Sequence, residues 1–174
     1  LKAHGNITMT RVLEESYNVG AVKVQQMEGG ANFYKYLSLF GIGRKTGVDV
    51  GNEVAQPLPP LDSVYPSQLA TMSFGQGIAV TPIQMISALN TVANGGRYVT
   101  PRAVTERIRS DGSVTALPVT QGAQVITPAT ARQMRDMMVS VVEHGSGFTA
   151  KIDGWAGQVA GKTGTATIPE NGKY

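Results

Sequence analysis

The sequence contains no cysteine, which excludes disulfide frameworks, cysteine-based metal sites and a thiol nucleophile. It has only two histidines, His4 and His144, and neither lies in a paired spacing of the kind that binds zinc, so we expect no metal and no cofactor. No apolar run reaches the roughly 18 residues of a membrane-spanning helix. Lysines and arginines are scattered rather than clustered, so the net charge of +3 does not indicate a nucleic-acid partner.

The composition is that of a folded chain. With 41% hydrophobic and 16% charged residues, the sequence does not have the balance of an intrinsically disordered segment. Its 174 residues suit one domain or a large piece of one. The chain starts at Leu1 rather than at a methionine, no signal peptide precedes it, and Tyr174 follows a strand-like run directly. We therefore expect a fragment of a longer protein.

Apolar periodicity and capping residues predict a largely helical chain. Residues 10–15 and 19–27 form two helical pieces with a hinge at Ser16-Tyr17-Asn18. Thr81-Pro82 and Thr127-Pro128 each place a capping residue before a proline at the first helical position. Further helices are expected at 31–40, 67–74, 83–93 and from Pro128 to near Gly145, the last with a core-facing stripe of Ala131, Met134, Met138, Val141 and Val142.

Strands and loops complete the expected organisation. Frequent glycine and proline between residues 42 and 66 predict a long loop. Residues 98–109 and 114–117 flank Ser110-Asp111-Gly112, which predicts a hairpin. Residues 155–168 are rich in Val, Thr, Ala and Gly and are predicted to form a strand. The fold class is therefore mixed, with helices and an antiparallel sheet (α+β).

One motif near the end of the chain suggests nucleotide binding. Residues 156–163 (AGQVAGKT) match a Walker A phosphate loop, except that alanine replaces the first glycine. Such a loop needs a buried strand before it and a helix after it. Asp153-Gly154-Trp155 has the composition of a turn, and Thr165 and Pro169 favour extended chain after the lysine. These neighbours argue against an NTPase.

If Lys162-Thr163-Gly164-Thr165 forms a strand, its side chains are placed so that they could bind a ligand and assist a reaction. Period-two alternation would place the Thr163 and Thr165 hydroxyls on one side, about 6.6 Å apart, where they can bracket a carboxylate. Gly164 would leave room for close packing, and Lys162 would put positive charge beside a reacting hydroxyl. For the tripeptide alone, a solvent-exposed lysine on an edge strand is the favoured explanation. Lys45-Thr46-Gly47 repeats the tripeptide in a loop just past a helix stop, so context must choose between the copies, and we assign the function to the second.

The hinge Ser16-Tyr17-Asn18 is the only Ser-x-Asn in the chain. A hydroxyl beside a lysine can shuttle a proton, and an amide can hold a peptide carbonyl. The alternative is a helix–helix turn that Ser16 and Asn18 cap locally.

Together these motifs resemble the class B penicillin-binding transpeptidases, in which Ser-x-Asn is followed much later by Lys-Thr-Gly-Thr. The segment 72–85 (MSFGQGIAVTPIQM) looks like the helix-entry segment of that family. Asn94-Gly95-Gly96, Gly145-Ser146-Gly147 and the Lys45 loop also lie where the family has them. The resemblance extends over nearly the whole chain, and it implies a partial β-lactamase/transpeptidase-like fold, with a helical subdomain and the Lys-Thr-Gly strand of an antiparallel sheet.

The resemblance implies a D,D-transpeptidase that cross-links peptidoglycan outside the bacterial cytoplasmic membrane. A serine would attack the D-Ala–D-Ala stem peptide and form an acyl-enzyme, and β-lactams would acylate the same serine. By position, Ser16 would relay protons, Asn18 would bind the substrate amide, and Lys162 would tune Ser16. Thr163, Gly164 and Thr165 would bind the terminal carboxylate, with the Thr165 N–H as an oxyanion-hole donor.

The sequence departs from the family pattern in one respect. The first motif, Ser-x-x-Lys, is absent, because none of the ten serines has lysine three positions later. We therefore expect residues 1–174 to be part of one transpeptidase domain, without the nucleophile segment before Leu1 and the last strands after Tyr174. The isolated chain should not be acylated by penicillin, and its final strand should need a complementary piece of the protein as a partner.

Two other functions remain open. A β-lactamase shares the fold, although segment 72–85 fits the synthetic branch better. A β-lactam-binding sensor or other non-catalytic relative would bind without turnover.

Overall fold

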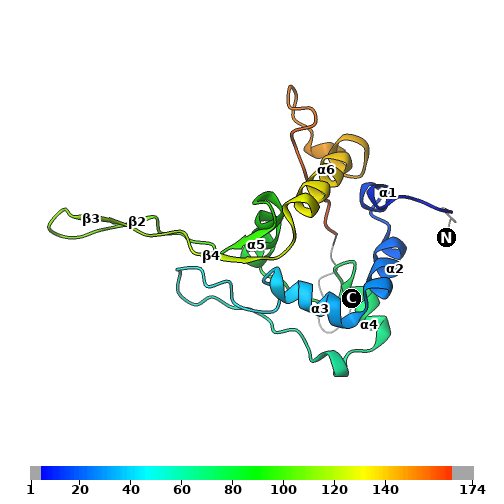
Figure 1. The fold of residues 1–174 in the computed structure, drawn as a ribbon, viewed down its shortest axis with the longest axis horizontal. Helices are drawn as coiled ribbons and strands as arrows, with labels where there is room; N and C mark the ends of the chain where they lie inside the picture. Colours follow the sequence, from blue (N-terminus) through cyan, green and yellow to red (C-terminus); the bar gives the residue numbers. More distant parts are fainter. Residues whose placement is uncertain (1–4, 166–174) are drawn as a thin grey trace. The chain divides into compact units, whose positions relative to one another are not determined.

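The computed structural model describes residues 5–165, which divide into two compact units (Figure 1). Of the described residues, unit 1 takes 5–31, 60–78 and 132–165, and unit 2 takes 32–59 and 79–131. Each unit therefore combines stretches of chain that are far apart in the sequence. No helix within residues 5–165 is both long enough and apolar enough to cross a bilayer.

Unit 1 is helical. It contains α1 (Met9–Glu14), α2 (Asn18–Glu28), α4 (Pro66–Met72) and the short 3-10 turns η1 (Leu61–Ser63) and η2 (Phe148–Ala150). It also contains most of α6 (Pro128–His144), whereas most of α3 (Gly30–Leu39) belongs to unit 2. Together with α5 (Pro82–Ala93) in unit 2, these bounds confirm the six predicted helices to within two residues at each end.

The start of α1 and its packing on α2 follow from local sequence. The Thr8 side chain accepts a hydrogen bond from the Arg11 backbone N–H at 3.2 Å, which caps the first turn. Gly20 lets α2 approach α1 closely, because a Cβ at that position would lie 2.6 Å from a Val12 methyl group. Val12 is consequently buried, and so are Met72, Val141 and Val142. Of the predicted apolar stripe of α6, Ala131, Val141 and Val142 are buried, whereas Met134 and Met138 are half-buried.

Unit 2 combines helix α5 and most of α3 with two small antiparallel sheets. Helix α5 (Pro82–Ala93) begins with the predicted cap, in which Thr81 and Gln84 bond reciprocally. Strand β1 (Arg97–Val99) pairs with β4 (Gln121–Gln124), and α5 packs on β1. Strands β2 (Glu106–Ile108) and β3 (Val114–Ala116) form the predicted hairpin, which extends away from α5 (Figure 1).

The predicted strand over 98–109 is in fact divided. Val99 ends β1 and Glu106 begins β2, with Thr100 and Pro101 between them. Proline has no N–H to donate to a ladder, so it interrupts the pairing. The predicted loop over 42–66 is confirmed, apart from η1 and the first residue of α4.

The predicted strand over 155–168 is wrong for residues 155–165, and residues 166–168 lie outside the described residues. Gln158 donates its N–H to the Trp155 carbonyl, and Gly157 has a φ of 72°, so the segment begins as turns. A strand is defined by a ladder with a partner, and residues 159–165 pair with no strand among the residues the structure describes.

Candidate active site

Ser16 occupies a position at the end of α1 that normally belongs to glycine. The Ser16 N–H bonds to the Leu13 carbonyl at 3.2 Å, and the Tyr17 N–H bonds to the Val12 carbonyl at 3.0 Å. This pair of bonds is a Schellman motif, whose central residue is left-handed. Ser16 accordingly has a φ of 54°, a conformation that costs a non-glycine residue about 1–2 kcal/mol. Such strain is typical of functional positions.

Lys162 contacts the Ser16 hydroxyl from 146 residues further along the chain. Its ammonium Nζ donates to Ser16 Oγ at 2.8 Å, to the Thr163 hydroxyl at 3.0 Å and to the Thr163 carbonyl at 3.1 Å. All three ammonium protons therefore have an acceptor. Lys162 keeps contact with solvent, but partial removal of the ammonium from water lowers the pKa of Lys162 below its usual value.

The lysine segment is attached to the C-terminal part of α6 and to the turn after it. The Gly161 N–H donates to the Met138 carbonyl at 3.1 Å, and the hydroxyls of Ser146 and Thr163 lie 3.1 Å apart in a hydrogen bond. Ser16, Lys162, Thr163 and Ser146 thus form one continuous chain of polar contacts. Such a chain can hold a proton donor and acceptor in fixed positions.

The structure also describes the remaining predicted site residues, which are exposed. Asn18 is the first residue of α2, two positions after Ser16, and it is exposed. Gly164 and Thr165 are also exposed. A Cβ built on Gly164 meets nothing within 4 Å among the described residues, so the predicted close packing over Gly164 is not seen there. The functions of Asn18, Thr163, Gly164 and Thr165 remain predictions.

The structure adds two residues to which the sequence analysis gave no function, Ser146 and Glu14. Ser146 bonds to Thr163 through its hydroxyl, and its N–H donates to the Glu14 carbonyl at 2.7 Å. Glu14 is buried, with 8% of its surface exposed. A serine between two glycines after a helix end was the available signal for Ser146. Nothing in the local sequence separates Glu14 from its neighbour Glu15.

The other Lys-Thr-Gly copy lies in unit 2 and is held differently. Glu53 accepts hydrogen bonds from the Thr46 N–H and hydroxyl, both at 2.6 Å, and from the Gly47 N–H at 3.0 Å. Thr46 is buried, with 4% of its surface exposed. This copy closes a loop, as its sequence context predicted.

Comparison with known proteins gives a consistent result. A family model described as the penicillin binding protein transpeptidase domain matches residues 1–174. Stage V sporulation protein D of Bacillus subtilis is 39% identical over 173 residues, which cover 98% of this chain and 26% of that protein. The peptidoglycan D,D-transpeptidase FtsI of Escherichia coli is 30% identical over 173 residues, with 98% and 27% covered. The chain spans about a quarter of the length of these curated relatives.

Solved structures show the same fold. Penicillin-binding protein 3 from Mycobacterium tuberculosis, in complex with ampicillin, matches with a TM-score of 0.88 and 36% identity, over 95% of this chain and 38% of that one. A peptidoglycan synthetase from Bifidobacterium adolescentis matches with a TM-score of 0.79 and 29% identity, over 95% and 32%. The predicted mixed fold, as part of the fold of these proteins, is confirmed.

Proposed function

The chain belongs to the penicillin-binding protein transpeptidase family, and from this membership we propose that it carries the second and third active-site motifs of a peptidoglycan D,D-transpeptidase. The observation that supports this most is the 2.8 Å contact between Lys162 Nζ and Ser16 Oγ. It brings the Ser-x-Asn and Lys-Thr-Gly motifs to one place within unit 1. Both units then form part of one transpeptidase domain.

The proposed reaction is acyl transfer in two steps. A serine hydroxyl attacks the carbonyl carbon between the two D-alanines, the amide bond breaks, and the released D-alanine amine takes up the serine proton. An amine from a neighbouring stem peptide then attacks the acyl-enzyme ester, restores the serine hydroxyl and forms the cross-link. β-Lactams acylate the same serine by opening their ring. The nucleophile belongs to a Ser-x-x-Lys motif, which residues 1–174 do not contain.

Ser16 and Lys162 would carry the proton in this reaction. The lowered pKa of Lys162 makes its neutral amine easier to reach, so that the amine can take a proton from Ser16 or return one. The Ser16 hydroxyl can then pass that proton to the leaving amine. Asn18, on the first turn of α2, would bind the substrate amide through its side-chain carboxamide.

The segment after Lys162 would bind the acidic end of the substrate. Thr163 and Thr165 are exposed and offer hydroxyls to the terminal carboxylate of D-Ala–D-Ala or to the carboxylate of a β-lactam. Gly164, between them, adds no side chain that could block the ligand. The Thr165 N–H would donate to the oxyanion that develops on the carbonyl oxygen. Peptidoglycan lies outside the cytoplasmic membrane, so we place this activity there.

A second candidate function is a β-lactam-binding sensor or other non-catalytic relative. Residues 1–174 do not separate it from the transpeptidase, since none of their serines has lysine three positions later. In such a relative the motifs would bind a ligand without turnover. A complementary part of the same protein would supply the nucleophile in the transpeptidase and would lack it in the sensor.

Labelling with a fluorescent penicillin tests the proposal. The complete product of the gene is incubated with the reagent, and the labelled peptide is identified by mass spectrometry. We expect one serine adduct, in a Ser-x-x-Lys motif outside residues 1–174, and slow release of the label. The chain of residues 1–174 alone should take up no label. Absence of an adduct on the complete product, or an adduct within residues 1–174, would contradict the proposal.

A further inference from the structure

The C-terminal end of α1 is fastened to α6 and to the turn after it by Glu14, two residues before Ser16. We propose that Glu14 is a positioning residue for the reaction, because its side chain and its backbone carbonyl together hold the Ser16 hydroxyl opposite Lys162. This inference rests on the proposed function.

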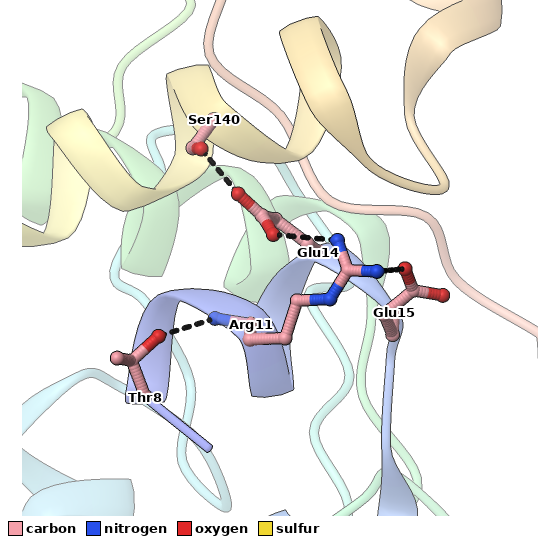
Figure 2. A network of polar contacts seen from close by, with 5 residues as sticks. All are labelled: Thr8, Arg11, Glu14, Glu15 and Ser140. Atoms are coloured by element: carbon pink, nitrogen blue, oxygen red, sulfur yellow. Dashed lines mark hydrogen bonds and ion pairs between the residues drawn. The ribbon is translucent and has the colours of Figure 1, made fainter. Parts of the chain in front are cut away.

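The side chain of Glu14 makes the first attachment, which Figure 2 shows from close by. Its carboxylate accepts a hydrogen bond from the Ser140 hydroxyl of α6 at 2.5 Å and from the Arg11 guanidinium at 3.2 Å. Hydrogen bonding to Ser140, with help from Arg11, lowers the pKa of Glu14. The carboxylate is therefore charged at neutral pH and is held by partners on two helices.

The backbone of Glu14 makes the second attachment. Its carbonyl accepts the Ser146 N–H at 2.7 Å, directly after α6 ends. Gly145 permits this approach, since a Cβ there would lie 2.5 Å from the Glu14 oxygen and 2.6 Å from its Cα. Two attachments, one through the side chain and one through the main chain, fix both the position and the rotation of the last turn of α1.

Lys162 and Thr163 are also attached to the C-terminal part of α6 and to the turn after it. Met138 of α6 accepts the Gly161 N–H, and Ser146 bonds to the Thr163 hydroxyl. The C-terminal part of α6 and its following turn therefore hold Ser16 on one side and Lys162-Thr163 on the other. A displacement of α1 relative to α6 would change the distance between Ser16 Oγ and Lys162 Nζ directly.

Burying the charge of Glu14 and straining the backbone at Ser16 both cost free energy, which indicates that Glu14 has a role beyond packing. A charged carboxylate is kept at a position that is only 8% exposed, where burial disfavours the charge. It also precedes a residue with a strained, left-handed backbone, which persists only where the surroundings over-determine it. Among the described residues, the neighbouring carboxylate of Glu15 forms an ion pair with Arg11, whereas the Ser140 hydroxyl donates to Glu14.

Acylation kinetics of the complete gene product test the proposal. We compare the wild type with Glu14→Gln, Ser140→Ala and Ser140→Thr, and Glu15→Gln serves as the matched control that removes a carboxylate from the next position. The acylation rate constant and the dissociation constant of the preceding non-covalent complex are measured separately with benzylpenicillin. Thermal unfolding of each variant reports whether it is folded.

We expect the acylation rate constant to fall about tenfold in Glu14→Gln and Ser140→Ala, because misplacement of a reacting group slows chemistry. The dissociation constant should stay within about twofold, since the carboxylate-binding hydroxyls of Thr163 and Thr165 are intact. Ser140→Thr keeps a hydroxyl and should restore most of the rate, and Glu15→Gln should resemble the wild type. A role confined to stability would not produce this division between rate and binding.

The possible failures differ in meaning. If the wild type is acylated and both Glu14→Gln and Ser140→Ala keep its rate constant, the inference is overturned and the proposed function stands. If the wild type is not acylated at all, the proposed function is overturned and this inference with it. Should Glu14→Gln not fold, Ser140→Ala decides the question, because it keeps the carboxylate and its contact with Arg11.

Discussion

The tripeptide Lys-Thr-Gly occurs once in each unit, and the two copies have different environments. In unit 2, Thr46 is buried and its hydroxyl and N–H both bond to Glu53, which also binds the Gly47 N–H. In unit 1, Thr163 is exposed, and its hydroxyl lies between the Lys162 ammonium and the Ser146 hydroxyl. In the second copy, the lysine contacts another motif through Ser16, and no such contact of Lys45 occurs within residues 5–165.

The comparison separates a structural use of the tripeptide from a chemical one. A carboxylate that accepts three hydrogen bonds holds the loop of the first copy, and the N–H and hydroxyl of Thr46 both serve the fold. In the second copy, hydroxyl and amine groups face one another and keep contact with solvent. Groups that remain accessible can take up a substrate, whereas fully engaged groups cannot. The following predictions test this difference, starting with the largest expected effect.

Removing Lys162 should slow the reaction strongly, whereas removing Lys45 should have almost no effect. In the complete gene product, Lys162→Ala should slow acylation by penicillin by about 10²–10⁴-fold, because it removes the group that exchanges protons with Ser16. Lys45→Ala should change the rate less than twofold. The rates are measured by time-resolved labelling with a fluorescent penicillin. Equal rates in the two variants would end the distinction between the copies.

Replacing each threonine should separate stability from activity. Thr46→Val removes the hydroxyl that donates to the half-buried Glu53 carboxylate, and the backbone donors of Thr46 and Gly47 stay. Because a hydrogen bond to a charged group is lost, we expect a loss of about 1–3 kcal/mol in the free energy of unfolding. Because Thr163 is exposed, Thr163→Val should change the free energy of unfolding by no more than about 0.5 kcal/mol. The same substitution should weaken penicillin binding. Denaturant titration of both variants measures the difference. A larger destabilisation by Thr163→Val would reverse our interpretation of the two sites.

The pH dependence of stability should depend on the first copy. Hydrogen bonds from Thr46 and Gly47 lower the pKa of Glu53 in the folded chain. Because the folded pKa lies below the unfolded one, near 4.3, the contribution is present above about pH 4.3 and is lost as the pH falls through the folded pKa. Glu53→Gln should therefore unfold with a weaker dependence on pH in the acid range. Thermal unfolding between pH 3 and pH 6, compared with the exposed-site control Asp62→Asn, gives the measurement.

The smallest effect concerns two non-glycine residues that have positive φ in the described part of the chain, Ser16 in unit 1 at 54° and Asn52 in unit 2 at 62°. Asparagine tolerates the left-handed region better than serine does. Ser16→Gly should raise the free energy of unfolding by up to about 1 kcal/mol, and Asn52→Gly should leave it nearly unchanged. Denaturant titration checks both. An equal gain at the two positions would argue against special strain at Ser16.

Local sequence predicted the parts of this molecule that local forces determine. The Thr81-Pro82 cap, the glycine after α3 and the periodicity of α6 each identify a helix, because capping bonds and apolar stripes depend on neighbours within a few residues. The hinge at Ser16 was also visible, since a polar residue interrupts two helical patterns. The contact between Ser16 and Lys162 was expected only because of a family resemblance.

The errors arise where structure depends on distant partners. Residues 155–165 have the composition of a strand, but a strand needs a ladder, and composition does not indicate where a partner lies. Glu14 and Ser146 were missed for the same reason. Their contacts come from the way α1 meets the end of α6, across more than 120 residues of chain. Gly145-Ser146-Gly147 was visible as a family-like segment but indicated no partner for Ser146, and no motif pointed to Glu14.

A crystal structure of the complete gene product with a bound penicillin would test the central claim most directly, which is that the Ser16 and Lys162 motifs form one reaction site. We predict a distance of about 3 Å between Ser16 Oγ and Lys162 Nζ, which is a hydrogen-bond distance. We also predict that the drug carboxylate contacts the hydroxyls of Thr163 and Thr165. A drug molecule bound elsewhere, or one whose carboxylate contacts the Lys45-Thr46-Gly47 copy, would contradict it.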